Sequence, residues 1–222
     1  MHLTLFDLDG TLLPIDSDHA FGEFVVRLGW ADPHEHGRQN DAFFQDYQAG
    51  RLDMDRYIDF ATAAWRQRSP DEIDRASARF MAEVITPALR DSARSLVGKH
   101  RARGDRLAVV TATNDFVTRP IAQAFGIDEL IATELERASD GRPTGRIRGV
   151  PALREGKITR VAQWLAAQGA SAEDFETVTF YSDSTNDLPL LERVTHPVAT
   201  NPGPALAKIA SERGWPILKL FE

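Results

Sequence analysis

The sequence predicts an α/β protein with a parallel sheet covered by helices on both faces. Short runs that are apolar throughout, such as 107–112 and 178–181, alternate with amphipathic stretches of helical period in the second part of the chain. Before them, residues 14–86 show only the helical period. We therefore expect an α/β core formed by residues 1–13 and 87–222, and an inserted helical domain formed by residues 14–86.

Composition is that of an ordinary globular chain. Its 222 residues are 42% hydrophobic and 27% charged, enough for a sizeable core. The net charge of -7 argues against non-specific binding to nucleic acid or anionic membranes. The chain has no Cys, which excludes disulfides and thiolate zinc sites and fits a reducing, cytoplasmic location. We find no signal peptide and no apolar run near the ~18 residues that a membrane span needs.

The first element is a strand over residues 2–8, and helices follow it. In the insert, Asp53 is a suitable N-cap for one helix. Residues 69–72, Ser-Pro-Asp-Glu, form a capping-box start for another. The apolar spacing predicts helices around 21–28, 43–47, 54–65 and 70–84.

After residue 87 the elements are expected to alternate. Helices are predicted around 88–103, 114–125, 156–165, 185–193 and 201–213, and strands around 107–112, 130–135, 178–181, 196–200 and 216–220. Residues 139–149 have the turn-rich composition of a hairpin. We interpret its Arg142, Arg146 and Arg148 as solvated charges rather than as phosphate ligands.

Polar side chains stand where several predicted strands end. Asp7 and Asp9 follow the first strand, Thr111 closes the second, and Asp183 follows the strand at 178–181. Ligands bind at the carboxyl ends of the strands in such sheets, so we expect these residues to meet. Two carboxylates at the end of a buried strand require a compensating positive charge. A hard cation such as Mg²⁺ suits them.

Together these residues give the chain a resemblance to the haloacid dehalogenase superfamily of phosphotransferases. Residues 7–11 match its Asp-x-Asp-Gly-Thr motif, and Thr111 matches the Ser/Thr that ends a strand. Lys157 matches the motif Lys that opens a helix, and residues 183–187 match the acidic motif. The chain is most similar to the phosphoserine-phosphatase-like branch, which includes histidinol-phosphate phosphatases. This implies a Rossmann-like core and makes the helical insert a C1 cap.

The resemblance implies a Mg²⁺-dependent phosphatase. Asp7 would be the nucleophile that forms an aspartyl-phosphate, and Asp9 would be the general acid and base. Magnesium would be held by the Asp7 side chain, the Asp9 backbone carbonyl and Asp183, with Asp187 in support. Phosphate would be bound by the Thr111 hydroxyl, the backbone at Ala112, Lys157 and Asn186.

The cap is expected to choose the substrate. In this branch an acidic residue of the cap binds the amino group of the substrate. Asp16 occupies the matching position, and Asp18 lies close by in the sequence. A cap Arg reads a carboxylate, but its position falls on Asp59, and Arg56 lies nearly one turn earlier. These acids favour an amine-bearing phosphomonoester without a carboxylate, such as histidinol phosphate, and leave phosphoserine open.

The same motifs bear on three other functions. A phosphomutase or other phosphotransferase would keep all four motifs and stays open. A C–halogen hydrolase would not need Asp9. A non-catalytic binding protein would be expected to have lost some of Asp7, Asp9, Lys157 or Asp183, and all are present. The sequence makes no prediction of oligomeric state.

Overall fold

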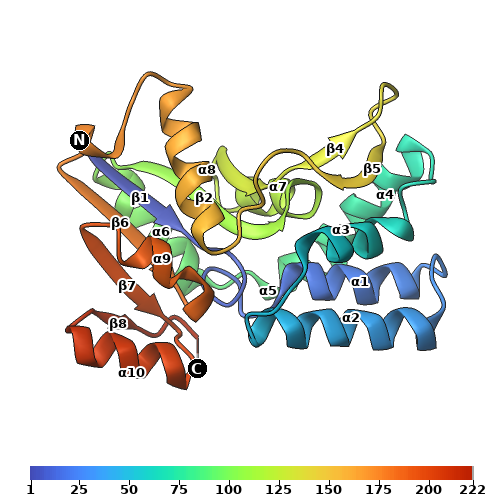
Figure 1. The fold of residues 1–222 in the computed structure, drawn as a ribbon, viewed down its shortest axis with the longest axis horizontal. Helices are drawn as coiled ribbons and strands as arrows, with labels where there is room; N and C mark the ends of the chain where they lie inside the picture. Colours follow the sequence, from blue (N-terminus) through green and yellow to red (C-terminus); the bar gives the residue numbers. More distant parts are fainter. Residues whose placement is uncertain (222) are drawn as a thin grey trace.

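A six-stranded parallel sheet forms the centre of the structure, a computed structural model that describes residues 1–221 (Figure 1). The strand order is β3-β2-β1-β6-β7-β8. The strands are β1 (His2–Phe6), β2 (Arg106–Asn114), β3 (Glu129–Thr133), β6 (Thr177–Ser182), β7 (His196–Thr200) and β8 (Ile217–Leu218). The predicted α/β fold is confirmed.

Helices cover both faces of this sheet, which is why the central strands β1, β2 and β6 carry buried residues on both sides. In β1, Leu3 and Leu5 pack on one face and Phe6 on the other, and all three are fully buried. The Leu3 face is covered by α8 (Glu155–Ala166), α9 (Leu188–Leu191) and α10 (Pro204–Arg213). The Phe6 face is covered by α6 (Asp91–Ala102) and α7 (Asp115–Ala124).

The predicted helical insert forms a lobe beyond the carboxyl ends of the strands (Figure 1). It contains α1 (Ser17–Arg27), α2 (Pro33–Gln48), α3 (Met54–Ala63), α4 (Pro70–Phe80), a π-helix (Met81–Ile85) and α5 (Thr86–Ala88). The proposed boundary at residues 86–87 falls inside α5, so the backbone is helical there. The division into core and cap at this position stays a prediction.

Helix α2 is much longer than the short helix expected near residues 43–47. It begins at Pro33, after the N-cap Asp32, and runs for 16 residues. Only His36 and Asn40 are buried in it. Its first half is polar on nearly every side, so the apolar spacing revealed only its end.

The predicted hairpin is formed by β4 (Leu135–Arg137) and β5 (Pro143–Ile147). It lies against the cap beside α3 (Figure 1). Gly145 has φ +89, and a Cβ there would meet the Arg66 guanidinium of the cap. Arg142 and Arg148 lie near acidic neighbours on the hairpin and its base, Asp140 and Glu134.

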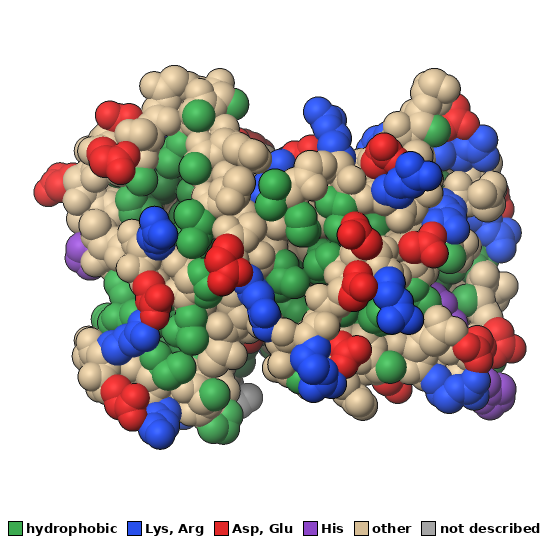
Figure 2. All heavy atoms as spheres, in the orientation of Figure 1, with side chains coloured by type: hydrophobic (Ala, Val, Ile, Leu, Met, Phe, Trp, Pro, Cys, Tyr) green, Lys and Arg blue, Asp and Glu red, His purple; other side chains and the backbone are tan. Residues whose placement is uncertain are grey.

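Charged side chains of both signs are interspersed over the face shown in Figure 2. Within residues 1–221, no helix combines the length and apolar character that crossing a membrane requires.

A buried polar network ties the centre of the sheet to α6. Asp105 accepts hydrogen bonds from the Thr4 hydroxyl at 2.9 Å and the Arg103 Nε at 2.9 Å, and it lies 2.6 Å from the His100 Nδ1. The other ring nitrogen of His100 lies 2.7 Å from the Tyr181 hydroxyl. These bonds, first that of Arg103, hold the pKa of Asp105 well below its usual range. Asp105 therefore stabilises the fold in its charged form.

We expect Asp105→Ala to lower the free energy of unfolding at pH 7 by about 2 kcal/mol, because buried partners lose their acceptor. The pKa of Asp105 is depressed in the folded state. The lowering of the free energy of unfolding is therefore greatest above the ordinary Asp pKa of about 4, and it becomes smaller as the pH falls below that value. Urea unfolding from pH 7 to pH 3 measures this. Exposed Asp140, changed to Ala, is the control and should alter little. A pH-independent difference would contradict the assignment.

Candidate active site

The loop after β1 places two carboxylates at the carboxyl edge of the sheet. The Asp7 backbone N–H still pairs with the Tyr181 carbonyl of β6, at 2.9 Å, so Asp7 continues the strand. The Leu8 carbonyl then accepts the N–H groups of Leu12 and Leu13 at 2.8 and 2.9 Å, which closes a compact turn. Leu8 is fully buried, and Asp7 and Asp9 flank it at the sheet edge.

Lys157 joins Asp7 to Asp187. Its Nζ lies 2.9 Å from Asp7 Oδ1 and 2.7 Å from Asp187 Oδ2, and all three side chains are buried. The Ser182 hydroxyl donates a further bond to Asp187, at 2.6 Å. Burial opposes the charged form of Lys157, but the charges of Asp187 and Asp7 raise its pKa above the ordinary value. Lys157 is therefore a fixed cation at the carboxylate that sequence reasoning assigned as nucleophile.

Asp183 faces Asp7 across Thr11. The Thr11 hydroxyl donates to Asp183 Oδ1 at 2.9 Å and lies 3.4 Å from Asp7 Oδ2. Burial and then the charge of Asp7 raise the pKa of Asp183 well above its usual range. Gly10, at φ +75, leaves this side open, since a Cβ there would lie 2.4 Å from Asp183 Oδ2. Two facing carboxylates in a small space fit a hard divalent cation.

The four predicted metal residues do not form one carboxylate cluster. Within residues 1–221, no three His, Cys, Asp or Glu side chains converge closely enough to hold a metal ion by themselves. The Asp187 carboxylate is used by Lys157 and Ser182, and the Asp9 carboxylate points elsewhere. A cation here would therefore use the Asp7 and Asp183 side chains, a backbone carbonyl and water.

The Asp9 carboxylate is held from both sides. The backbone N–H of Ser17, the first residue of α1, donates to Oδ1 at 2.8 Å. The Thr113 hydroxyl of β2 donates to Oδ2 at 2.9 Å. Burial first, and then the charge of Asp16, raise the pKa of Asp9 to about 7. Such a group can both give and take a proton near neutral pH.

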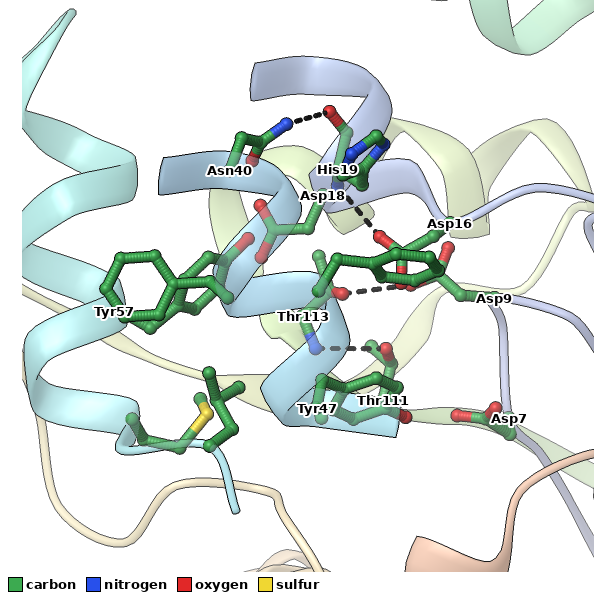
Figure 3. A pocket seen from close by; sticks show the side chains of 15 residues that line it. Asp7, Asp9, Asp16, Asp18, His19, Asn40, Tyr47, Tyr57, Thr111 and Thr113 are labelled. Atoms are coloured by element: carbon green, nitrogen blue, oxygen red, sulfur yellow. Dashed lines mark hydrogen bonds between the residues drawn. The ribbon is translucent and has the colours of Figure 1, made fainter. Parts of the chain in front are cut away.

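Asp7 and Asp9 face a cavity between the sheet edge and the cap (Figure 3). Asp7, Asp9, Thr111 and Ala112 line one end. The cap end carries Asp16 and Asp18 together with polar and apolar side chains. These polar and apolar side chains are His19, Asn40, Phe43, Phe44, Tyr47, Leu52, Met54 and Tyr57.

Two cap residues considered for substrate recognition, Asp59 and Arg56, lie outside this cavity. Asp59 is on the exposed face of α3, where it pairs with Arg66. The buried face of that helix carries Tyr57 instead. Arg56 is also exposed and lines no part of the cavity. Among the described lining residues there is no Lys or Arg.

Asn186 is turned toward the cap. Its Nδ2 donates to the Tyr47 carbonyl at 2.9 Å, and its Oδ1 lies 3.5 Å from Arg154 Nε. Arg154, with φ 53, also donates to the Gly50 carbonyl. The structure thus uses Asn186 as a contact between core and cap, not as a lining residue of the cavity.

The sequence matches the haloacid dehalogenase-like hydrolase family over residues 4–192. The chain belongs to this family. It is 45% identical to a histidinol-phosphatase of Neisseria meningitidis serogroup C (strain 8013), with 98% of each chain covered. A solved structure of a Bordetella pertussis Tohama I protein of unknown function is 50% identical, with a TM-score of 0.93 and 99% of both chains covered.

The fold is also that of a substrate-bound phosphoserine phosphatase. That structure is 18% identical, with a TM-score of 0.68, and the match covers 97% of this chain and 91% of the other. At this identity the likeness concerns the fold alone. The resemblance to the haloacid dehalogenase family, and to its phosphoserine-phosphatase-like branch, is confirmed.

Sequence reasoning missed several residues of this haloacid dehalogenase-like site. Thr113 holds Asp9, and its place two residues after Thr111 on one strand was the available signal. Tyr47 and Tyr57 follow the helical spacing of the predicted helices at 43–47 and 54–65, and this spacing indicates packing rather than a site. Asn114 caps α7 through Oδ1 and donates its Nδ2 to Asp18 at 3.1 Å.

We expect Thr113→Val to lower kcat about fivefold with little change in KM, because Asp9 loses one of the two bonds that hold it. Thr113→Ser keeps the hydroxyl and should restore most of kcat. Steady-state kinetics on any accepted phosphomonoester measures both variants. Equal impairment of the Ser and Val variants would show that packing, not the hydroxyl, matters.

Proposed function

We propose that this protein is a Mg²⁺-dependent phosphatase of a small amine-bearing phosphomonoester, with histidinol phosphate as substrate. The observation that carries the proposal is the cavity. It joins Asp7 and Asp9 to the cap carboxylates Asp16 and Asp18, and no Lys or Arg is found among its described lining residues. The full-length likeness to a histidinol-phosphatase supports the same substrate.

In the first step, Asp7 attacks phosphorus while the bond to the leaving oxygen breaks. Asp9 gives its proton to that oxygen, and the alcohol departs. In the second step, water attacks the aspartyl-phosphate and Asp9 takes its proton. Inorganic phosphate leaves, and the Asp7 carboxylate is restored. The two bonds from Ser17 and Thr113 keep Asp9 in place through both steps.

Charge has to be neutralised for Asp7 to approach a phosphate. At about 4 Å and an effective dielectric near 20, each pair of like charges costs roughly 4 kcal/mol. Lys157 supplies one fixed positive charge beside Asp7. Magnesium would be held by Asp7, Asp183 and the Asp9 carbonyl, and would supply charge neutralisation at the phosphate oxygens. Thr111 and Ala112 line the end where phosphate oxygens would lie.

The cap end of the cavity favours a cationic leaving group. Asp16 and Asp18 are buried carboxyl groups, and a substrate ammonium beside them would stabilise their charged form. Phosphoserine carries an ammonium as well as a carboxylate. Its carboxylate would meet no guanidinium or ammonium among the described lining residues. Histidinol phosphate has the ammonium without the carboxylate.

The nucleophile and the cation are tested together by phosphate release. We expect Asp7→Asn to lower kcat by about 10³-fold or more, because the amide cannot form the aspartyl-phosphate. EDTA should abolish wild-type activity, and added Mg²⁺ should restore it. Asp128→Asn, on an exposed loop, is the control and should retain activity. Full activity in Asp7→Asn or in EDTA would reject these assignments.

The substrate is tested by a panel of phosphomonoesters. We expect kcat/KM for histidinol phosphate to exceed that for phosphoserine by about tenfold or more. An unpaired substrate carboxylate costs binding free energy, and each 1.4 kcal/mol of that cost lowers kcat/KM about tenfold. Phosphoserine turnover equal to or above that of histidinol phosphate would reject the preference. Release of inorganic phosphate distinguishes hydrolysis from transfer to another hydroxyl.

A further inference from the structure

The two cap carboxylates in the cavity have different surroundings. Asp16 is the N-cap of α1, and its carboxylate accepts the His19 N–H at 2.8 Å. It is close enough to Asp9 for its charge to raise the pKa of that group. Figure 3 shows Asp16 beside Asp9, whereas Asp18 points away from them toward Tyr57. Asp16 therefore lies nearer the reacting phosphate than Asp18 does.

Asp18 is a buried carboxylate that is fixed in place but has no cationic partner. It is 7% exposed. Asn114 Nδ2 donates to its Oδ1 at 3.1 Å, and Tyr57 lines the cavity on the side toward which Asp18 points (Figure 3). No Lys, Arg or His of residues 1–221 forms an ion pair with it. Burial, and then the charge of Asp16, raise the pKa of Asp18 to about 8. A buried carboxylate of this kind favours a ligand that brings a positive or N–H-bearing group.

The walls around Asp18 suit a flat group. Tyr57 and Phe43 have ring centroids 5.4 Å apart, and Phe44 and Met54 line the same cavity. Aromatic faces attract cations and stack with planar rings. A flexible aliphatic ammonium would use only the carboxylate, whereas a planar ring with N–H groups would use both the carboxylate and the walls.

Resting on the proposed function, we propose that Asp18 and Tyr57 form a second subsite that holds an N–H-bearing planar ring of the substrate, while Asp16 takes the ammonium. In histidinol phosphate the ammonium is on the carbon next to the phosphorylated methylene, and the imidazole is one methylene further away. The order phosphate, ammonium, ring matches the order Asp7, Asp16, Asp18 in the cavity. Asp18 is then a specificity-determining residue.

The test compares two substrates that share the phosphate and the ammonium. O-phosphoethanolamine has the same spacing between these groups as histidinol phosphate but has no ring. The readout is the ratio of kcat/KM for histidinol phosphate to that for O-phosphoethanolamine. We expect Asp18→Asn to lower this ratio about tenfold or more, and Tyr57→Phe to lower it about threefold. Asp16→Asn should lower both kcat/KM values and change the ratio by less than about twofold.

A binding measurement accompanies the kinetics. Histidinol, the product without phosphate, should inhibit the wild type competitively, and its inhibition constant should rise about tenfold in Asp18→Asn. Asp74→Asn, an exposed acid on α4, is the matched control and should change neither quantity. Thermal unfolding identifies a variant that does not fold, and Tyr57→Phe, which keeps the ring, then carries the test.

The outcomes separate the two proposals. If the wild type hydrolyses histidinol phosphate but neither Asp18→Asn nor Tyr57→Phe lowers the ratio, the ring subsite is wrong and the proposed function stands. If Asp16→Asn lowers the ratio as much as Asp18→Asn, the assignment of the ammonium to Asp16 and of the ring to Asp18 is wrong. If the wild type does not hydrolyse histidinol phosphate, the proposed function fails and the subsite with it.

Discussion

The structure depends on one buried ion group, Lys157 between Asp7 and Asp187. Among residues 1–221, Lys157 is the only Lys or Arg that is buried. An isolated ammonium or carboxylate would be costly at this depth, but the three charges lie within hydrogen-bond distance and compensate one another. The group links β1, the start of α8 and the segment after β6. Any displacement of these elements would leave a buried charge without a partner.

The parallel sheet determines which side chains can reach this group. Parallel strands end at one edge, so the loops after β1, β2 and β6 meet although they are far apart in sequence. At this edge Asp7 is surrounded by Lys157, by Thr11 and Asp183, and by Thr111 of β2. The cap closes the remaining side and adds the Ser17 N–H to the set of groups that hold Asp9.

The sequence was sufficient where short-range patterns determine structure. Apolar strand runs and the turn at residues 7–11 predicted the sheet, its edge and the placement of Asp7, Asp9, Thr111 and Asp183, and the family resemblance added Lys157. It was insufficient where the answer depends on how a helix is rotated or which distant group a side chain meets. Asp59 was expected in the cavity, but α3 presents its other face there. Asn186 was expected at the phosphate, but the Tyr47 carbonyl lies within its reach.

The contacts of Asn186 and Arg154 with the cap have a consequence for how such an enzyme can diversify. Both side chains donate to backbone carbonyls, those of Tyr47 and Gly50. A backbone acceptor is present whatever side chain the residue carries. Mutations that replace side chains lining the cavity therefore leave these contacts between cap and core in place. Substrate specificity can then change in evolution while the position of the cap over the reacting residues stays the same.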